Sequence, residues 1–181
     1  MKSKLHITAI ILVLSLSIIA GSCKKLDEFP DEPEIEYIGF ERLFNPDDTV
    51  FTRGVLKFSF QDGDGDLGFR DRDTMPPFNY GSEYYYNLVV TYFEIRNGVR
   101  TEVPLTFYNP STQQFDTITQ SSRFPSLTPD AVNKSISGEI YDTLFIYNYN
   151  SDFDSLMFEA FIYDRSLNQS NVITTDTIVR R

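Results

Sequence analysis

The chain has 181 residues and a formal net charge of −10, with 26 acidic and 16 basic side chains, one histidine and one cysteine. This acidic balance argues against nucleic acid as a partner, because phosphate neutralisation requires clustered lysine and arginine side chains. Divalent cations or basic protein surfaces are better matched to such a charge.

Residues 1–22 predict a targeting segment. Lys2 and Lys4 precede an apolar run over residues 7–20, which is too short to span a bilayer comfortably. Small residues at positions 20–22 stand directly before Cys23, the one cysteine of the chain. We therefore expect residues 1–22 to be removed as a signal peptide.

The cleavage region, Ile-Ile-Ala-Gly-Ser-Cys at residues 18–23, resembles the lipobox of bacterial lipoproteins. In that family the cysteine is lipidated and becomes the first residue of the mature protein. The resemblance implies that Cys23 is the lipidation site and that acyl chains anchor the protein to a membrane without spanning it. A plain secretory signal with an incidental cysteine is the alternative.

Removing 22 of the 181 residues leaves 159, a length that suits one domain with a sizeable core. Lys2, Lys4 and His6 leave with the signal, so the formal charge changes from −10 to −12. Without histidine or a free thiol, the mature chain has no Ser-His-Asp triad, no Cys-His dyad and no usual zinc site. We therefore expect a protein that is not an enzyme.

Residues 23–33 are charged, contain Pro30 and Pro33, and predict a tether between lipid and domain. Asp27 and Glu28 follow the cysteine at a short distance, after two lysines. This acidic stretch resembles the signal that exports lipoproteins of the Bacteroidota to the outer face of the outer membrane. The resemblance implies an outer-membrane protein, with surface exposure favoured over a periplasm-facing position.

From residue 34 onward the sequence predicts strands separated by polar turns. The turn pair Asn97-Gly98 predicts a type I′ hairpin, because that turn needs positive φ at both central positions. The polar stretch 107–134 predicts either an edge strand near 115–118 or a brief helix near 129–133. The expected strands cover residues 35–44, 55–60, 84–96, 99–105, 135–148, 156–163 and 172–179.

About seven short strands with almost no helix predict an all-β fold over residues 34–181, an antiparallel β-sandwich. The stretch Asp164 to Asn171 resembles the last hairpin of immunoglobulin-like domains in bacterial surface proteins. The resemblance implies an immunoglobulin-like sandwich. A jelly roll or an eight-stranded barrel are the alternatives.

The run Asp-Gly-Asp-Gly-Asp-Leu-Gly at residues 62–68, called here the acidic turn, follows the alternating stretch 55–60 directly. Ca²⁺ prefers six to eight oxygen ligands of this kind. An EF-hand is excluded, because Leu67 stands at its glycine position and a strand precedes the loop. The alternative is a solvated turn without metal.

Extra ligands for such a turn have to come from another loop. If residues 55–60 and 156–163 are the second and sixth strands of the sandwich, the loops that follow them emerge at the same end. We therefore predict one structural Ca²⁺ bound by these two loops. Its candidate ligands are Asp62, Asp64, Asp66, Asp164, Asn168 and Asn171.

The function expected from the sequence is that of a lipid-anchored, non-catalytic accessory or interaction subunit of an envelope protein complex at the outer membrane. The chain resembles the small lipoproteins of the Bacteroidota in this respect. Tyr84 to Tyr86 suggest a surface glycan-binding protein as one alternative, since aromatic rings present flat apolar faces. A calcium-dependent hydrolase using Asp62 and Asp66 as paired carboxylates is another, and a structural spacer is the third.

Overall fold

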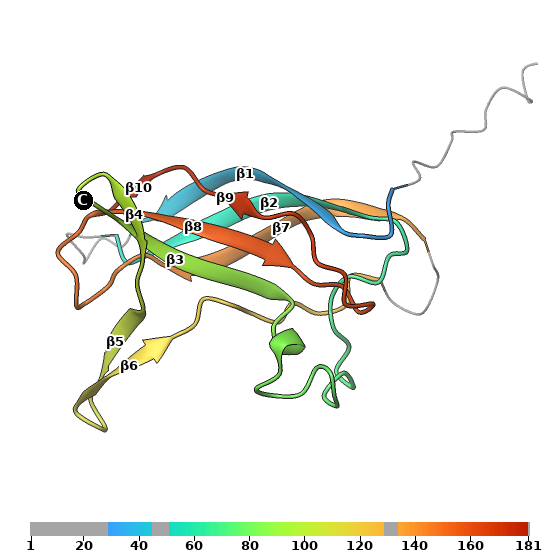
Figure 1. Ribbon diagram of the computed structural model, residues 1–181, viewed down its shortest axis with the longest axis horizontal. Helices are drawn as coiled ribbons and strands as arrows, with labels where there is room; N and C mark the ends of the chain where they lie inside the picture. Colours follow the sequence, from blue (N-terminus) through green and yellow to red (C-terminus); the bar gives the residue numbers. More distant parts are fainter. Residues whose placement is uncertain (1–28, 45–50, 129–133, 181) are drawn as a thin grey trace, which may run out of the picture.

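A computed structural model describes residues 29–44, 51–128 and 134–180 of the chain. It is an antiparallel β-sandwich whose sheets do not close into a barrel (Figure 1). The predicted fold class is therefore confirmed, and the barrel alternative is excluded. No helix within the described ranges is long and apolar enough to cross a bilayer.

The two main sheets divide the chain as follows. The first has the order β1-β2-β7, built from β1 (Glu34–Leu43), β2 (Arg53–Asp62) and β7 (Ile136–Phe145). The second has the order β10-β8-β3-β4, built from β3 (Leu88–Arg96), β4 (Val99–Glu102), β8 (Ser155–Ile162) and β10 (Ile178–Val179), with β9 (Ile173–Thr174) pairing with β8. The assignment of strands to the two sheets matches that of immunoglobulin-like sandwiches, where strands A, B and E form one sheet and C, F and G the other.

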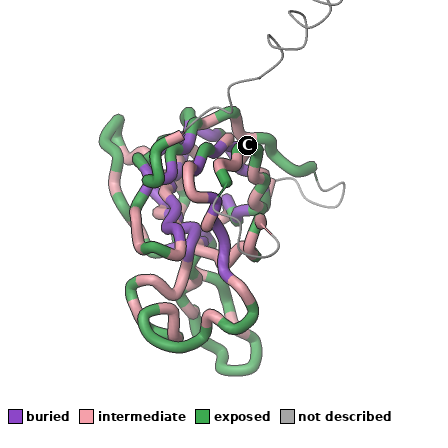
Figure 2. Tube along the Cα trace, turned by 90° about the vertical axis from the view of Figure 1, so that its right-hand side faces the viewer, coloured by how far each residue is buried: buried purple, intermediate pink, exposed green. Residues whose placement is uncertain are grey.

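The core lies between these sheets, because one face of each central strand is apolar. Every second residue of β2 is buried, and β8 shows the same alternation. Figure 2 shows the buried residues gathered in the middle of the sandwich. The inward-facing side chains that fill it include Leu56, Phe58, Phe60, Leu156, Phe158, Ala160 and Ile162.

The expected single strand over 99–105 is wrong. The chain leaves the second sheet after β4 and forms a separate hairpin of β5 (Leu105–Asn109) and β6 (Gln114–Ile118). Pro104 lies at the break, and proline has no N–H to donate to a continuing ladder. Strand β6 confirms the edge strand expected near 115–118, whereas the helix considered at 129–133 lies outside the described residues.

The expected start of the third strand at residue 84 is also wrong. Glu83–Tyr85 form a short 3-10 helix, η1, and β3 begins at Leu88. The side chain of buried Asn87 accepts from the Phe124 N–H at 2.8 Å and donates to the Phe124 carbonyl at 2.9 Å, and so holds the chain before the strand. The Asn97-Gly98 turn is confirmed, with φ of 53° and 76°.

The last expected strand, 172–179, is two short strands. Thr175 lies between β9 and β10, and its backbone N–H donates to the Phe158 carbonyl at 3.0 Å. Its hydroxyl accepts from the Phe158 N–H, also at 3.0 Å. One threonine therefore hydrogen-bonds both backbone groups of Phe158, the N–H and the carbonyl. The regular ladder is interrupted at that point.

Candidate metal centre

Asp62 is buried because it continues the inward-facing side of β2. The strand alternates through Leu56, Phe58 and Phe60, and Asp62 is the next residue with the same orientation. Its side chain is 0% exposed, and neither carboxylate oxygen has a hydrogen-bond partner among the described residues. A buried carboxylate without partners destabilises the folded state, and either a bound cation or a proton would neutralise its charge.

Two further carboxylates converge on Asp62. Ligand oxygens of Asp62, Asp64 and Asp66 all lie within 4.8 Å of one another. Because Ca²⁺–oxygen distances are about 2.3–2.6 Å, ligands on opposite sides of one ion are at most about 5 Å apart. The three side chains are therefore close enough together to bind a single calcium ion.

The electrostatics of the acidic turn also favour a cation. Burial, and then the charges of Asp64, Asp66 and Asp164, raise the pKa of Asp62 to about 7. Burial and the charge of Asp66 likewise raise the pKa of Asp64. Arg165 forms no ion pair with these carboxylates among the described residues; its Nη1 donates to the Gly68 carbonyl at 2.9 Å and to Ser126 Oγ at 3.0 Å.

The loop after β8 meets the acidic turn, as the sequence predicts. Leu67 and Asp164 form an isolated antiparallel bridge. The Arg165 N–H donates to Asp66 Oδ1 at 3.3 Å, and the Ser166 hydroxyl donates to Asp66 Oδ2 at 2.8 Å. Asp164 is fully buried beside the cluster, and burial is the main cause that raises its pKa to about 6.

The two asparagines of this loop have other visible roles. Asn168 donates through its backbone N–H to Asp164 Oδ1 at 2.7 Å and through Nδ2 to Asp164 Oδ2 at 2.8 Å, so it orients that carboxylate. Asn171 accepts from the Ile35 N–H and donates to the Ile35 carbonyl, both at 2.8 Å. Its amide fastens the start of β1, and that geometry gives it no direct place among the carboxylates.

The tether also reaches the acidic turn. The Gly63 N–H donates to the Pro30 carbonyl at 2.8 Å. A Cβ at Gly63 would lie 2.3 Å from the Phe29 carbonyl oxygen, so only glycine allows this approach. Gly65 has a φ of +71°, a left-handed conformation that glycine adopts without strain.

Sequence reasoning missed several participants, among them Pro30, Arg165 and Ser166. Pro30 acts through its backbone carbonyl, which leaves no residue-type signal, whereas Arg165 uses both its backbone N–H and its guanidinium. The burial of Asp62 did have a signal, because extending the period-two pattern of β2 by one step places it on the core face. Ser166 stands in the sequence beside the predicted ligand Asp164 and adds a hydroxyl donor.

The remaining candidate positions are placed as follows. Asp62 is fully buried, so its carboxylate is not available to a glycosidic bond in solvent. The Tyr84 ring packs edge-on against Tyr163 with centroids 4.9 Å apart, and the Tyr85 ring packs edge-on against Tyr86 at 4.8 Å, so each of these rings contacts another aromatic ring. Cys23, the predicted lipidation site, lies outside the described residues.

Comparisons of the chain with protein-family models, with curated proteins and with solved structures found no match.

Proposed function

We propose that this protein is a lipid-anchored, non-catalytic module of the bacterial outer membrane that serves as an accessory or interaction subunit of an envelope assembly. In this proposal a structural Ca²⁺ in the acidic turn joins the tether to the sandwich. The observation that carries the calcium site is the buried Asp62 carboxylate, whose two oxygens have no partner among the described residues.

Asp62, Asp64 and Asp66 are the direct ligands in this proposal, and Asp164 completes the negative charge from the second loop. Asp62 and Asp64 have oxygens available to a cation. In the described part of the chain neither Asp62 oxygen has a hydrogen-bond partner, and Asp64 Oδ1 accepts from the Asp66 N–H at 3.3 Å. Asp66 accepts from Arg165 and Ser166 and retains lone pairs. Backbone carbonyls and water supply the remaining oxygens that calcium requires.

A position close to the membrane gives the calcium site a mechanical role. The acidic turn contacts Pro30, seven residues after the predicted lipidated cysteine. A cation that rigidifies this turn fixes the angle between tether and sandwich. A fixed angle presents the far end of the sandwich to a partner in one orientation.

Calorimetric titration of the purified full chain with CaCl₂ tests the calcium site. We expect one site per chain in the wild type and loss of the binding heat in Asp64→Ala. Asp71→Ala is the matched control, since Asp71 lies on an exposed loop outside the cluster. The absence of saturable heat in the wild type would refute the site.

Two further measurements test the anchor and the interaction role. Mass spectrometry of the chain extracted from membranes should show acyl chains on Cys23, and Cys23→Ser should remove them and release the protein. Purification from native membranes in mild detergent should retain an envelope partner. A protein that elutes alone at native expression levels would contradict the interaction role.

A further inference from the structure

A pocket of about 500 Å³ lies at the end of the sandwich remote from the acidic turn. It opens between the start of β2, the β5–β6 hairpin and the segment that follows β7. Its lining includes Arg53, Thr106, Phe107, Phe145, Tyr147 and Tyr149. Arg53 and Asp62 are the first and last residues of β2, so the pocket is about 30 Å from the acidic turn.

The walls of this pocket are held rigidly by side-chain amides. Gln120 donates through Nε2 to the Phe145 carbonyl at 2.6 Å and accepts from the Phe145 N–H at 3.2 Å. On the other side, Asn150 donates to Thr106 Oγ1 at 2.8 Å. The hairpin is therefore fastened at a fixed distance from β7, and the space between them is a feature of the fold.

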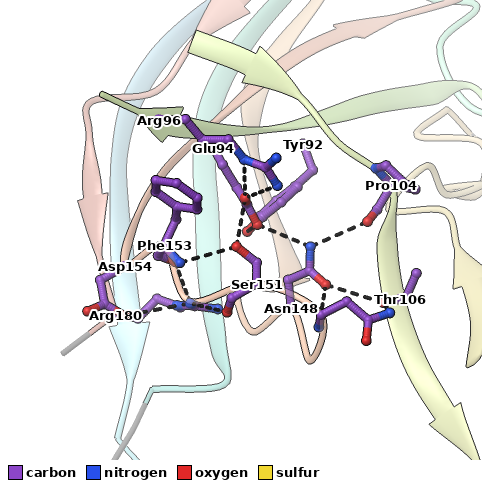
Figure 3. A network of polar contacts seen from close by, with 11 residues as sticks. Tyr92, Glu94, Arg96, Pro104, Thr106, Asn148, Ser151, Phe153, Asp154 and Arg180 are labelled. Atoms are coloured by element: carbon purple, nitrogen blue, oxygen red, sulfur yellow. Dashed lines mark hydrogen bonds and ion pairs between the residues drawn. The ribbon is translucent and has the colours of Figure 1, made fainter. Parts of the chain in front are cut away.

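A polar network around Glu94 holds the segment that contains Asn148 and Ser151 (Figure 3). Glu94 is 0% exposed and accepts from Asn148 Nδ2 at 3.1 Å and from the Ser151 hydroxyl at 2.8 Å. These two residues lie on either side of Tyr149 in the chain. The segment that carries Tyr147 and Tyr149 is thus preorganised, which lowers the cost of binding a ligand.

Three aromatic residues of the lining keep solvent-exposed surface. Phe107, Phe145 and Tyr149 are 38%, 41% and 61% exposed. A concave site of this volume with several aromatic walls and few polar groups is typical of small-molecule binding. A flat apolar body fits such walls, because aromatic faces stack on it.

Arg53 defines the charge of the ligand. Its guanidinium carbon lies 4.8 Å from the centroid of the Phe145 ring, and it makes no ion pair with any described residue. A cation–π contact uses no N–H hydrogen bond, so the guanidinium keeps donors for an anionic ligand. Within residues 29–44, 51–128 and 134–180, no acidic side chain lines the pocket, although the chain as a whole is strongly acidic.

We propose that this pocket binds a small organic anion with a flat ring, whose ring lies among Phe107, Phe145 and Tyr149 and whose carboxylate pairs with Arg53. The inference is independent of the calcium site. The pocket lies at the end of the sandwich opposite the tether, so it faces away from the anchor that we propose.

Indole-3-acetate is a suitable probe, because the chain has no tryptophan and the indole fluorescence belongs to the probe alone. We would measure its anisotropy with the full chain in detergent, using protein-free detergent as the blank. Indole-3-ethanol is the uncharged counterpart. We expect saturable binding of indole-3-acetate that a calcium chelator leaves unchanged.

Substitutions test the charged part and the aromatic part of the pocket separately. Arg53→Gln should weaken indole-3-acetate about tenfold and leave indole-3-ethanol unchanged, since only the charged hydrogen bonds are lost. Tyr149→Ala should weaken both probes severalfold without lowering the melting temperature, because this side chain is largely exposed. Arg72→Gln, on the exposed loop at the other end of the sandwich, should change neither.

Three results would overturn the proposal. They are no saturable binding of indole-3-acetate, equal binding by wild type and Arg53→Gln, and equal binding by wild type and Tyr149→Ala.

Discussion

The backbone N–H of Arg165 donates to Oδ1 of Asp66 at 3.3 Å, across 99 residues of chain. This contact ties the loop after β8 to the acidic turn after β2. The two loops follow strands of different sheets. This hydrogen bond couples their conformations, so ordering one loop also orders the other. A cation bound to Asp66 therefore affects both loops.

Calcium should slow amide exchange in both loops together. We expect stronger protection at residues 62–68 and also at 164–168, because Asp66 holds Arg165 and Ser166. Hydrogen-exchange mass spectrometry with calcium and with chelator measures this. The β5–β6 hairpin at the other end serves as the internal control, and protection confined to residues 62–68 would contradict the coupling.

The effect of Asp62→Asn on the free energy of unfolding should have opposite signs in chelator and in calcium. In chelator at about pH 8, we expect the variant to be more stable than wild type by about 1–3 kcal/mol, because a buried unpaired charge is removed. In saturating calcium it should be less stable, because a ligand is lost. Urea unfolding under both conditions measures the two differences, and destabilisation in both would show that Asp62 is only a packing residue.

The metal-free protein should lose stability as the pH rises from about 4 to about 7. Burial and neighbouring charges raise the pKa of Asp62 to about 7 and burial raises that of Asp164 to about 6, whereas an unfolded carboxyl group titrates near 4. In this window the folded state binds more protons than the unfolded state, so the slope of unfolding free energy against pH is negative. Urea titrations in chelator measure that slope.

Asp62→Asn is the control for the pH experiment and should flatten the slope. Calcium competes with protons for the same oxygens, so its affinity should increase across the same window. A wild-type stability that rises between about pH 5 and pH 7 without metal would contradict the assigned cause.

Glu94→Ala should destabilise the fold by about 3–5 kcal/mol, because it leaves buried partners unpaired. Glu94 accepts from Tyr92 at 3.2 Å, from Arg96 at 2.7 Å and from Asn148 at 3.1 Å. Chemical denaturation measures the loss. Glu102→Ala, at an exposed position of β4, should change stability by less than about 0.5 kcal/mol, and a similar loss in both variants would count against the network.

The sequence predicted those parts of the fold that depend on period-two alternation and turn chemistry. Strand β2 alternates cleanly, and Asn97-Gly98 selects its turn by backbone conformation alone. The separate β5–β6 hairpin was only half predicted, because its strands are short and mostly exposed. The position of the hairpin beside β7 depends on contacts such as Gln120 with Phe145, which no local pattern contains.

For the candidate site, the sequence predicted that two distant loops meet but not how their side chains are used. Asp164 lies beside the cluster as expected, whereas Asn171 binds the backbone of Ile35 instead. An asparagine amide serves equally as a metal ligand and as a partner for a strand backbone. Only the tertiary structure decides between these uses.

The melting temperature of the full chain in calcium and in chelator tests the central claim most directly. With calcium at about one hundred times its dissociation constant, binding adds about 2.7 kcal/mol. For a domain of this size, that corresponds to a rise of about 5–10 °C. Asp62→Asn should show no rise, and an equal melting temperature of the wild type in calcium and in chelator would contradict the claim.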